Sequence, residues 1–281
     1  MKISQGVRPA TMSIWYAASV MMANPFLVAK ADVHPIVEVQ SGYLFGATIN
    51  SKWIKSEEAA KAISDERTYK IYGLTQSLGE ANGAKPKPSE EEVCSDVLTV
   101  SLSSKPDKGA IALAAPWNAL PRKPRIADTT QQVYVDAVRE FLRTKEIDQP
   151  KVKIENILRV DLDGDGEEEV LISATNYFDK ENRVPMRSPA GSYSMVLLRR
   201  VVAGKVETQL VDGEFYPKAY LSNDASFNAP NAYTVIAVLD LDGDGKMEVV
   251  VASSYYEGEA TTIYRCGPKK VEAVLSVACG A

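Results

Sequence analysis

The chain has 281 residues, of which 45% are hydrophobic and 25% are charged, and its formal net charge is −5. This composition is that of a folded protein with a hydrophobic core and excludes a disordered chain. It also argues against a nucleic-acid-binding surface, which needs clustered Lys and Arg. The one basic run, at Pro121–Arg125, is predicted to be a solvated, proline-rich loop.

The first 31 residues predict export. Lys2 and Arg8 precede a largely apolar stretch, and Ala29-Lys30-Ala31 has the A-x-A form of a signal-peptidase site. We therefore predict a signal peptide over residues 1–31 and a secreted or periplasmic protein. The alternative is an uncleaved membrane anchor, because the stretch approaches spanning length. Cleavage removes three basic residues and no acidic ones, which changes the net charge from −5 to −8. No later segment is long and apolar enough to cross a membrane.

Residues 32–125 are predicted to form a β-rich N-terminal region. Four short β-branched or aromatic runs indicate strands, at residues 35–47, 68–74, 96–104 and 109–117. A short helix is expected from Ser56, with Ser56 as its cap and two glutamates in its first turn. The segment Gly79–Glu92 has the composition of a mobile loop.

Residues 126–150 are predicted to be a helix and a linker. Thr129 followed by Gln132 fits a capping box at the start of this helix. An apolar stripe then recurs at helical spacing, at Tyr134, Val138, Phe141 and Leu142. Such a stripe indicates core packing rather than a groove for a partner.

Residues 151–281 repeat themselves with an offset of 79 residues, which aligns Asp161 with Asp240 and Glu169 with Glu248. Each copy continues into a hairpin, so each is expected to form four antiparallel strands with an acidic loop joining the first two. The predicted fold is therefore mainly β, within the α+β class, with two four-stranded units in an open or small β-propeller. A closed propeller usually needs at least four blades. Either the N-terminal strands supply degenerate blades, or the structure is an open, partial version.

The two "DLDGDG" loops predict a metal site each. The loops hold ten acidic residues against one base, Lys246, and such clusters repel themselves unless a cation lies among them. Carboxylates at positions 1, 3, 5 and 9 and the carbonyl at position 7 supply hard oxygen ligands, which suit Ca²⁺. The predicted ligands are Asp161, Asp163, Asp165, Glu167 and Glu169 in the first loop, and Asp240, Asp242, Asp244, Lys246 and Glu248 in the second.

Two alternatives explain these loops less well. An EF-hand needs a bidentate Glu at position 12, where this chain has Ile172 and Val251 inside apolar runs. A bare hairpin turn explains the Asp and Gly residues but does not require four carboxylates in each loop. We therefore expect two structural Ca²⁺ ions, bound weakly, with dissociation constants of about 10⁻⁴–10⁻³ M.

The segments "DLDGDGEEEV" and "DLDGDGKMEV", each leading directly into an apolar strand, resemble the calcium loops of the FG-GAP or VCBS repeat family. The resemblance covers residues from about Val152 to the C-terminus. It implies β-propeller blades of the integrin-like type, with Ca²⁺ held between the first two strands of a blade by the residues named above.

The three cysteines predict one disulfide and one remaining thiol in an oxidising compartment. If Cys266 and Cys279 flank a hairpin that turns at "GPKK", Cys266 pairs near Val271. Cys279 then lies on the order of 25 Å further along the strand, too far for a bond that needs Cα atoms within about 7 Å. We predict a bond from Cys94 to one of the other two, with Cys279 favoured.

Catalytic residues are hard to find in this sequence. The one histidine, His34, lies close to the proposed cleavage site and is expected on a frayed terminus. Five tyrosines of the repeats are expected in cross-strand packing rather than on a contact surface, namely Tyr177, Tyr193, Tyr255, Tyr256 and Tyr264. We predict a non-catalytic binding or adhesion-type module for an unknown protein or polysaccharide ligand. The alternative is a secreted hydrolase that uses carboxylates on glycans or phosphoesters.

Overall fold

β-Branched and aromatic runs give this chain its architecture. The computed structural model describes Met1 and residues 32–107, 110–178, 184–219 and 229–280. Within them the protein is mainly β, with two α-helices and several antiparallel sheets. The predicted signal peptide and cleavage site fall in residues 2–31, outside the described residues. The helices that are described are too short or too polar to cross a membrane.

Six strands of the N-terminal region form one antiparallel sheet in the order β3-β2-β1-β8-β4-β5. These strands are β1 (Val33–Glu38), β2 (Leu44–Ile49), β3 (Lys52–Lys55), β4 (Arg67–Tyr72), β5 (Ser77–Gly83) and β8 (Ile111–Leu113). Strand β8 pairs with both β1 and β4, so a late segment of this region completes the middle of the sheet. The sheet therefore depends on contacts between residues far apart in sequence.

The segment Gly79–Glu92, expected to be a mobile loop, has half of its residues in paired strands, and for these residues the prediction was wrong. Its first part belongs to β5. Strand β6 (Lys87–Pro88) pairs with β7 (Leu98–Thr99), and the 3₁₀ helix η1 (Glu92–Cys94) follows. Backbone pairing outweighs a polar, proline-containing composition here, because both partner segments lie nearby in the fold.

Both predicted helices form, but without their predicted caps. Helix α1 (Ser56–Ala62) begins at Ser56 itself, after Lys55, so the Ser56 hydroxyl is not in the capping position. Helix α2 (Gln132–Arg143) begins after Gln131, again without a side-chain cap. The turn before α2 is instead fixed by Asp128, whose carboxylate accepts hydrogen bonds from the Thr130 amide and hydroxyl, both at 2.8 Å.

The apolar stripe of α2 packs as predicted. Tyr134, Val138 and Leu142 are buried, and Phe141 is partly buried beside them. They contact the first repeat, in a core cluster that includes Ile157 and other apolar side chains of its strands. The stripe therefore covers one face of the sheet rather than forming a groove.

The two predicted repeats form two antiparallel sheets. The first sheet has the order β13-β12-β11-β10-β9 and the second β14-β15-β16-β17. The strands of the first are β9 (Arg125–Ile126), β10 (Ile154–Val160), β11 (Glu169–Thr175), β12 (Ser192–Val202) and β13 (Lys205–Tyr216). Those of the second are β14 (Ala232–Leu239), β15 (Glu248–Tyr255), β16 (Gly258–Cys266) and β17 (Val271–Gly280). The first unit thus gains a fifth strand, β9.

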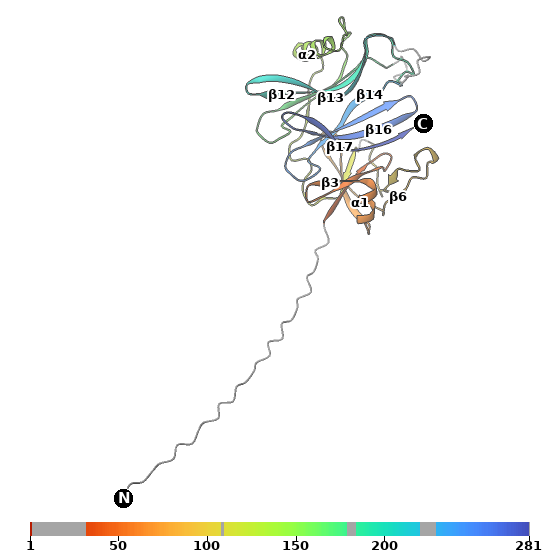
Figure 1. Ribbon diagram of the computed structural model, residues 1–281, viewed down its shortest axis with the longest axis vertical. Coiled ribbons are helices and arrows are strands. Elements are labelled where there is room, and N and C mark those ends of the chain that lie inside the picture. Colours follow the sequence, from red (N-terminus) through yellow and green to blue (C-terminus); the bar gives the residue numbers. More distant parts are fainter. Residues whose placement is uncertain (2–31, 108–109, 179–183, 220–228, 281) are drawn as a thin grey trace. The chain divides into compact units, whose positions relative to one another are not determined.

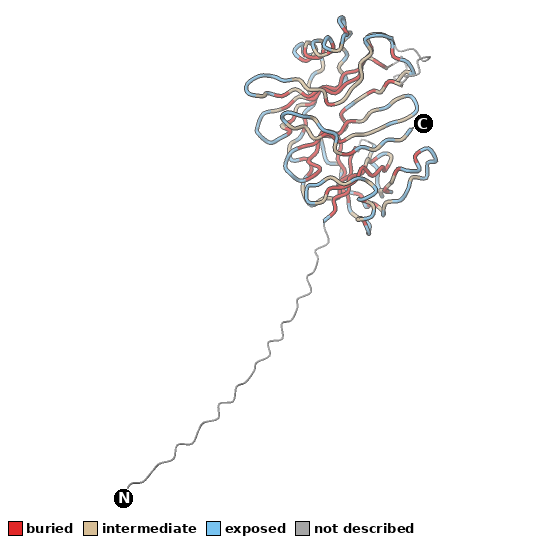
Figure 2. Tube along the Cα trace, in the orientation of Figure 1, coloured by how far each residue is buried: buried red, intermediate tan, exposed pale blue. Residues whose placement is uncertain are grey.

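Three sheets share one core, and they do not close into a barrel. The second repeat lies between the other two sheets (Figure 1), because β14 contacts β11 and β12 while β17 contacts β2 and β3. Figure 2 shows the buried residues concentrated on the strands where these sheets meet. The N-terminal strands therefore supply a third sheet beside the two repeats.

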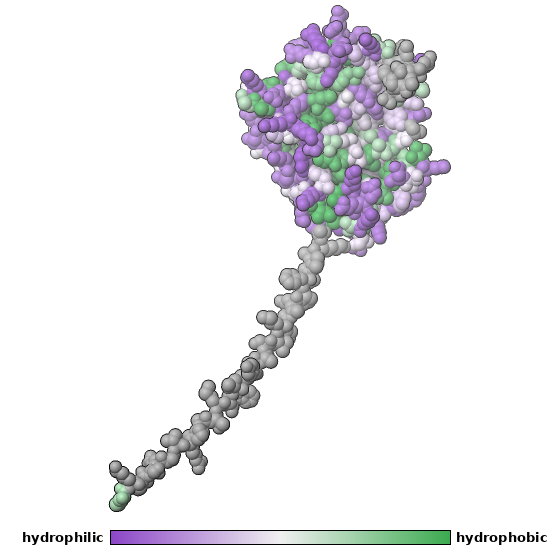
Figure 3. All heavy atoms as spheres, viewed as in Figure 1, coloured by the Kyte–Doolittle hydropathy of each residue, from purple (hydrophilic) through white to green (hydrophobic). Residues whose placement is uncertain are grey.

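Side chains on the repeat strands follow this packing. Tyr177, Tyr193 and Tyr264 are buried, as expected for cross-strand packing, whereas the rings of Tyr255 and Tyr256 meet edge to face at 5.7 Å near the surface. On the face drawn in Figure 3, hydrophilic residues dominate the folded part, and apolar residues show between them. Three of the five tyrosines expected in cross-strand packing are thus buried.

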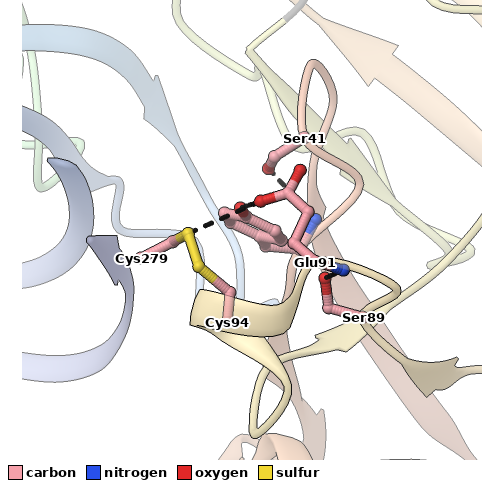
Figure 4. Close-up of a disulfide and its surroundings, with 6 residues drawn as sticks. Ser41, Ser89, Glu91, Cys94 and Cys279 are labelled. Carbon is pink, nitrogen blue, oxygen red and sulfur yellow. Dashed lines mark hydrogen bonds between the residues drawn. A yellow bond between two sulfur atoms is a disulfide. The ribbon is translucent and has the colours of Figure 1, made fainter. Parts of the chain in front are cut away.

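A disulfide joins Cys94 of η1 to Cys279 of β17, with Cα atoms 5.5 Å apart (Figure 4). The predicted pairing is confirmed, and Cys266 is the free cysteine of the chain. Cys266 pairs with Val271 across the β16–β17 hairpin, as the "GPKK" turn indicated. The bond therefore fastens the last strand of the second repeat to the N-terminal region.

Candidate metal centre

Each acidic loop is held between two paired strand residues. Val160 at the end of β10 pairs with Glu169 at the start of β11, and Leu239 at the end of β14 pairs with Glu248 at the start of β15. This register brings the position 9 glutamate back beside the start of its loop. The predicted closing ligand is therefore delivered by strand pairing rather than by a following helix.

The first loop is organised by its own carboxylates. Asp161 accepts hydrogen bonds from the Gly164 amide at 2.7 Å and the Gly166 amide at 3.1 Å. Glu169 accepts one from the Leu162 amide at 2.8 Å. Both glycines have φ near +90°, a conformation that other residues adopt only with strain, so the loop can curl around one point.

The second loop repeats this scheme residue for residue. Asp240 accepts from the Gly243 and Gly245 amides at 2.7 and 3.1 Å, and Glu248 accepts from the Leu241 amide at 2.9 Å. Two loops 79 residues apart thus share one hydrogen-bond pattern. The repetition indicates one local design used twice, not two unrelated turns.

Three of the predicted carboxylate ligands come together in each loop. In the first loop, ligand atoms of Asp161, Asp163 and Glu169 lie within 4.8 Å of one another. In the second loop the same is true of Asp240, Asp242 and Glu248. The second cluster is buried throughout, whereas Asp163 of the first is exposed.

The other predicted ligands lie outside these clusters. Asp165 accepts a hydrogen bond from the Glu167 amide, and Asp244 accepts one from the Lys246 amide, each at 2.8 Å. Both aspartates and the side chains of Glu167 and Lys246 are exposed. In this conformation the two aspartates stabilise the turn at position 7.

Burial changes the acidity of the second cluster. It raises the pKa of Glu248 to about 8, with Asp242 and Asp244 adding repulsion. Burial likewise raises the pKa values of Asp240, Asp242 and, in the first loop, Glu169. Since burial without a counter-charge penalises ionised carboxylates, a cation among them would restore their charged form.

The third strand of each repeat carries an arginine at the same register position, and the arginine of the second repeat contacts its acidic loop. Arg265 of β16 contacts Asp242, with Nη2 2.5 Å from Oδ2, and its Nε lies 3.9 Å from Glu248. Val170 pairs with Arg199 and Val249 pairs with Tyr264, so Arg200 occupies the corresponding position in the first repeat. Nothing in the loop motif indicates Arg265, because it reaches the loop only through strand pairing.

Other segments also support the loops. The Trp117 indole donates to the Asp240 carbonyl at 2.9 Å, and the Ser51 hydroxyl donates to the Asp242 carbonyl at 3.0 Å. Arg125 and Arg159 both contact Glu168, which is thereby committed to salt bridges. The basic run at Pro121–Arg125 is a mostly exposed loop, as predicted, but its Arg122 and Arg125 side chains also contact the acidic loops.

His34 is also placed differently from the prediction. It belongs to β1, is only 9% exposed, and its Nδ1 lies 3.2 Å from the Ala114 carbonyl. Its ring meets that of Trp117 edge to face at 4.6 Å. The residue is a packed strand residue rather than part of a frayed terminus, because β1 pairs with β2 from Val33 onward.

The chemistry of the two clusters suits a hard divalent cation. Several carboxylate oxygens converge without thiolate or imidazole groups, which is the donor set that Ca²⁺ prefers over Zn²⁺. A third group of candidate ligands, Glu91, Cys94 and Cys279, is different, because its two sulfur atoms form the disulfide and are not thiolates. Among the described residues, the two loops are therefore the candidate metal sites.

Comparison with known proteins agrees with this local design. The FG-GAP repeat family model matches residues 232–264. The matched residues run from β14 through the second acidic loop into β16. No curated protein and no solved structure gives a significant match to the chain. The C-terminal part of the chain thus contains an FG-GAP repeat.

Proposed function

We propose that the protein is an exported, non-catalytic, calcium-binding repeat protein that acts as a binding or adhesion-type module. One structural Ca²⁺ occupies each acidic loop. The observation that carries the proposal is the repeated cluster of converging carboxylates, three in each loop, on the same backbone scheme. The FG-GAP match at residues 232–264 supports a module of this type.

The ligands proposed for each ion follow the loop positions. The three clustered carboxylates bind directly, and the carbonyl at position 7, of Glu167 or Lys246, completes the shell together with the position 5 aspartate. Asp165 and Asp244 would have to turn inward to take part. Calcium tolerates six to eight oxygen ligands in flexible geometry, so a small rearrangement is compatible with binding.

Export is supported by the disulfide between Cys94 and Cys279. Such bonds persist in oxidising compartments and are rare where thiols are kept reduced. FG-GAP repeats occur in extracellular or exported proteins, which agrees with a secreted or periplasmic location. The partner we propose is a protein or a polysaccharide, and not a nucleic acid, because the mature chain is acidic.

Calorimetry in calcium and in EGTA tests the proposal. With millimolar calcium the thermal midpoint should rise by several degrees, because an ion that binds only the folded state stabilises it by mass action. The variant Asp163→Ala with Asp242→Ala should lose this rise. The exposed acid Glu272 lies outside both loops, so Glu272→Ala is the matched control and should keep it. Equal midpoints with calcium and EGTA would contradict the proposal.

A secreted hydrolase is the second candidate, and one feature favours it. A cavity of about 520 Å³ between the N-terminal sheet and the second repeat is lined by both Glu38 and Glu259. Burial, together with the negative charges of Glu38 and Glu91, raises the pKa of Glu259. Two carboxylates in one cavity, one of them with a raised pKa, are the kind of pair that glycosidases use.

A substrate screen separates the two candidates. Chromogenic glycosides and phosphoesters are offered to the protein with and without calcium. The non-catalytic proposal predicts no turnover. Turnover that disappears in Glu259→Gln, while the calcium-dependent midpoint stays unchanged, would establish the hydrolase instead.

A further inference from the structure

Arg122 touches both acidic loops. Its Nε donates to the Asp161 carbonyl at 2.5 Å, and its Nη2 donates to the Leu162 carbonyl at 3.0 Å. The same Nη2 donates to the Gly245 carbonyl of the second loop at 2.7 Å. One guanidinium therefore joins two loops that are 79 residues apart in the repeat.

The three carbonyls bound by Arg122 are not proposed metal ligands. Asp161 and Leu162 are at positions 1 and 2 of the first loop, and Gly245 is at position 6 of the second, whereas the ligand carbonyl is at position 7. Arg122 thus fixes the loop backbones without competing for an ion. A planar guanidinium can do this because it presents several donors in a fixed fork.

A backbone hydrogen bond also joins the two loops, at one of the carbonyls that Arg122 binds. The Met247 amide donates to the Leu162 carbonyl at 2.8 Å, so this carbonyl serves both Arg122 and the second loop. Leu162, Leu241 and Met247 are at most 3% exposed and belong to the same core cluster. The two loops therefore share a packed base as well as a polar bridge.

The segment that carries Arg122 also holds the second loop elsewhere. The Ala119 carbonyl accepts from the Asp240 amide at 2.8 Å, three residues before Arg122. Trp117 packs against Gly243, where an added Cβ would lie 3.3 Å from the ring. Both loops therefore contact the same short segment, residues 117–122, and neither can shift without disturbing it.

We infer that Arg122 couples the two loops, so that an ion bound in one raises the affinity of the other for Ca²⁺. The inference rests on the proposed function, since it requires both loops to bind the ion. An ion orders the backbone of the loop that holds it. Through Arg122 and the Leu162 carbonyl, the second loop is then already ordered and loses less conformational entropy when it binds.

Isothermal titration calorimetry of the full chain with Ca²⁺ tests the coupling. Asp242→Asn disables the second loop and leaves the first to be measured alone. With Arg122 present, this change should weaken calcium binding at the first loop by about fivefold or more. In an Arg122→Gln background, the same change should alter that affinity by less than about twofold.

Two matched variants separate geometry from charge. Lys123→Gln removes the same charge from the exposed neighbouring residue and should leave the coupling intact. Arg122→Lys keeps the charge but loses the fork, and it should abolish the coupling as Arg122→Gln does. An affinity at the first loop that is independent of the second in the unmodified protein would overturn the inference and leave the proposed function standing. A chain that binds no calcium at either loop would instead contradict the proposed function.

A second measurement needs no change at Arg122, in case its variants fold poorly. In Asp163→Asn the first loop loses a proposed ligand, and calcium fills the second. Hydrogen exchange at the Gly164 and Gly166 amides then reports on the first loop alone. The inference predicts slower exchange on calcium addition, and unchanged exchange in that variant would overturn it.

Discussion

Arg265 and Asp242 join the third strand of the second repeat to its acidic loop, with Nη2 and Oδ2 2.5 Å apart. The aspartate side chain is almost completely buried and the arginine is 42% exposed. The guanidinium also lies over the Trp53 ring, 5.7 Å from its centroid. The Arg265 guanidinium therefore compensates part of the negative charge of the second acidic loop, at the site of the proposed ion.

Arg265→Ala should destabilise the calcium-free protein by about 1–3 kcal/mol, because it leaves a buried carboxylate without its partner. In saturating calcium the loss should be smaller, since the ion neutralises Asp242. By linkage, the variant should then bind calcium several-fold more tightly at this loop. Urea unfolding with and without calcium measures both effects.

The control for this variant is Lys270→Ala, which removes a positive charge from an exposed pair with Glu272 at 3.4 Å. Exposed pairs contribute little, so its effect should stay within about 0.5 kcal/mol in either condition. If Arg265→Ala lowered the free energy of unfolding equally with and without calcium, Arg265 would not act at the metal site.

The stability of the calcium-free protein should fall as pH rises from about 4.5 to about 8. Glu248 has its pKa raised to about 8 in the folded state, so the folded protein holds a proton that the unfolded chain has released. The stabilisation from this proton is complete below the pKa of Glu248 in the unfolded chain. It is lost as the pH rises through the pKa of Glu248 in the folded protein. The change is on the order of a few kcal/mol for a group this buried.

Calcium should reverse this trend, because the ion replaces the proton and favours the ionised carboxylates. Urea midpoints measured from pH 5 to pH 8.5 in EGTA and in calcium give the two curves. The gap between them should widen with pH. A constant gap would mean that Glu248 is not at the ion.

Removal of the disulfide should cost about 2–5 kcal/mol, because it releases a long loop in the unfolded chain. The variant Cys94→Ser with Cys279→Ser tests this by urea unfolding, and dithiothreitol should lower the stability of the unmodified protein to a similar value. Cys266→Ser is the matched control, since Cys266 is outside the bond. Dithiothreitol should still destabilise that control. A double variant as stable as the original would show that the bond contributes little.

Leu142→Ala should destabilise the protein by about 2–5 kcal/mol, because it leaves a cavity between α2 and the first repeat. Leu142 is fully buried, whereas Val133 on the same helix is 56% exposed. Val133→Ala should therefore change the free energy of unfolding by no more than about 0.5 kcal/mol. Equal effects of the two substitutions in chemical unfolding would show that the helix does not cover this sheet.

Local signals predicted the repeats well. The spacing of carboxylates and glycines in "DLDGDG" indicated loops between paired strands, and the structure places Glu169 and Glu248 where each loop closes. The "GPKK" turn predicted Cys266 opposite Val271 and so excluded a Cys266–Cys279 bond, and of the two remaining pairings the favoured Cys94–Cys279 bond forms. These features depend on contacts between residues close in sequence, or on distances that strand geometry fixes.

Residues that act across the fold could not be predicted in this way. Arg122 and Arg265 reach the loops because separate sheets and strands meet, and no local pattern encodes such an approach. His34 is packed because β1 pairs with β2 and β8, which the sequence near the predicted cleavage site does not indicate. The predicted helix caps were wrong because α1 begins one residue earlier than a Ser56 cap requires, whereas α2 begins at Gln132, later than a Thr129 cap requires.

Calcium content shows whether the two acidic loops hold ions. The protein is dialysed to equilibrium against buffer with millimolar calcium, and bound calcium is determined by elemental analysis against the protein concentration. We expect about two ions for each chain, falling to one or fewer in Asp242→Asn and to none when Asp163→Asn is added. A chain that retains no calcium above the buffer level would contradict the account.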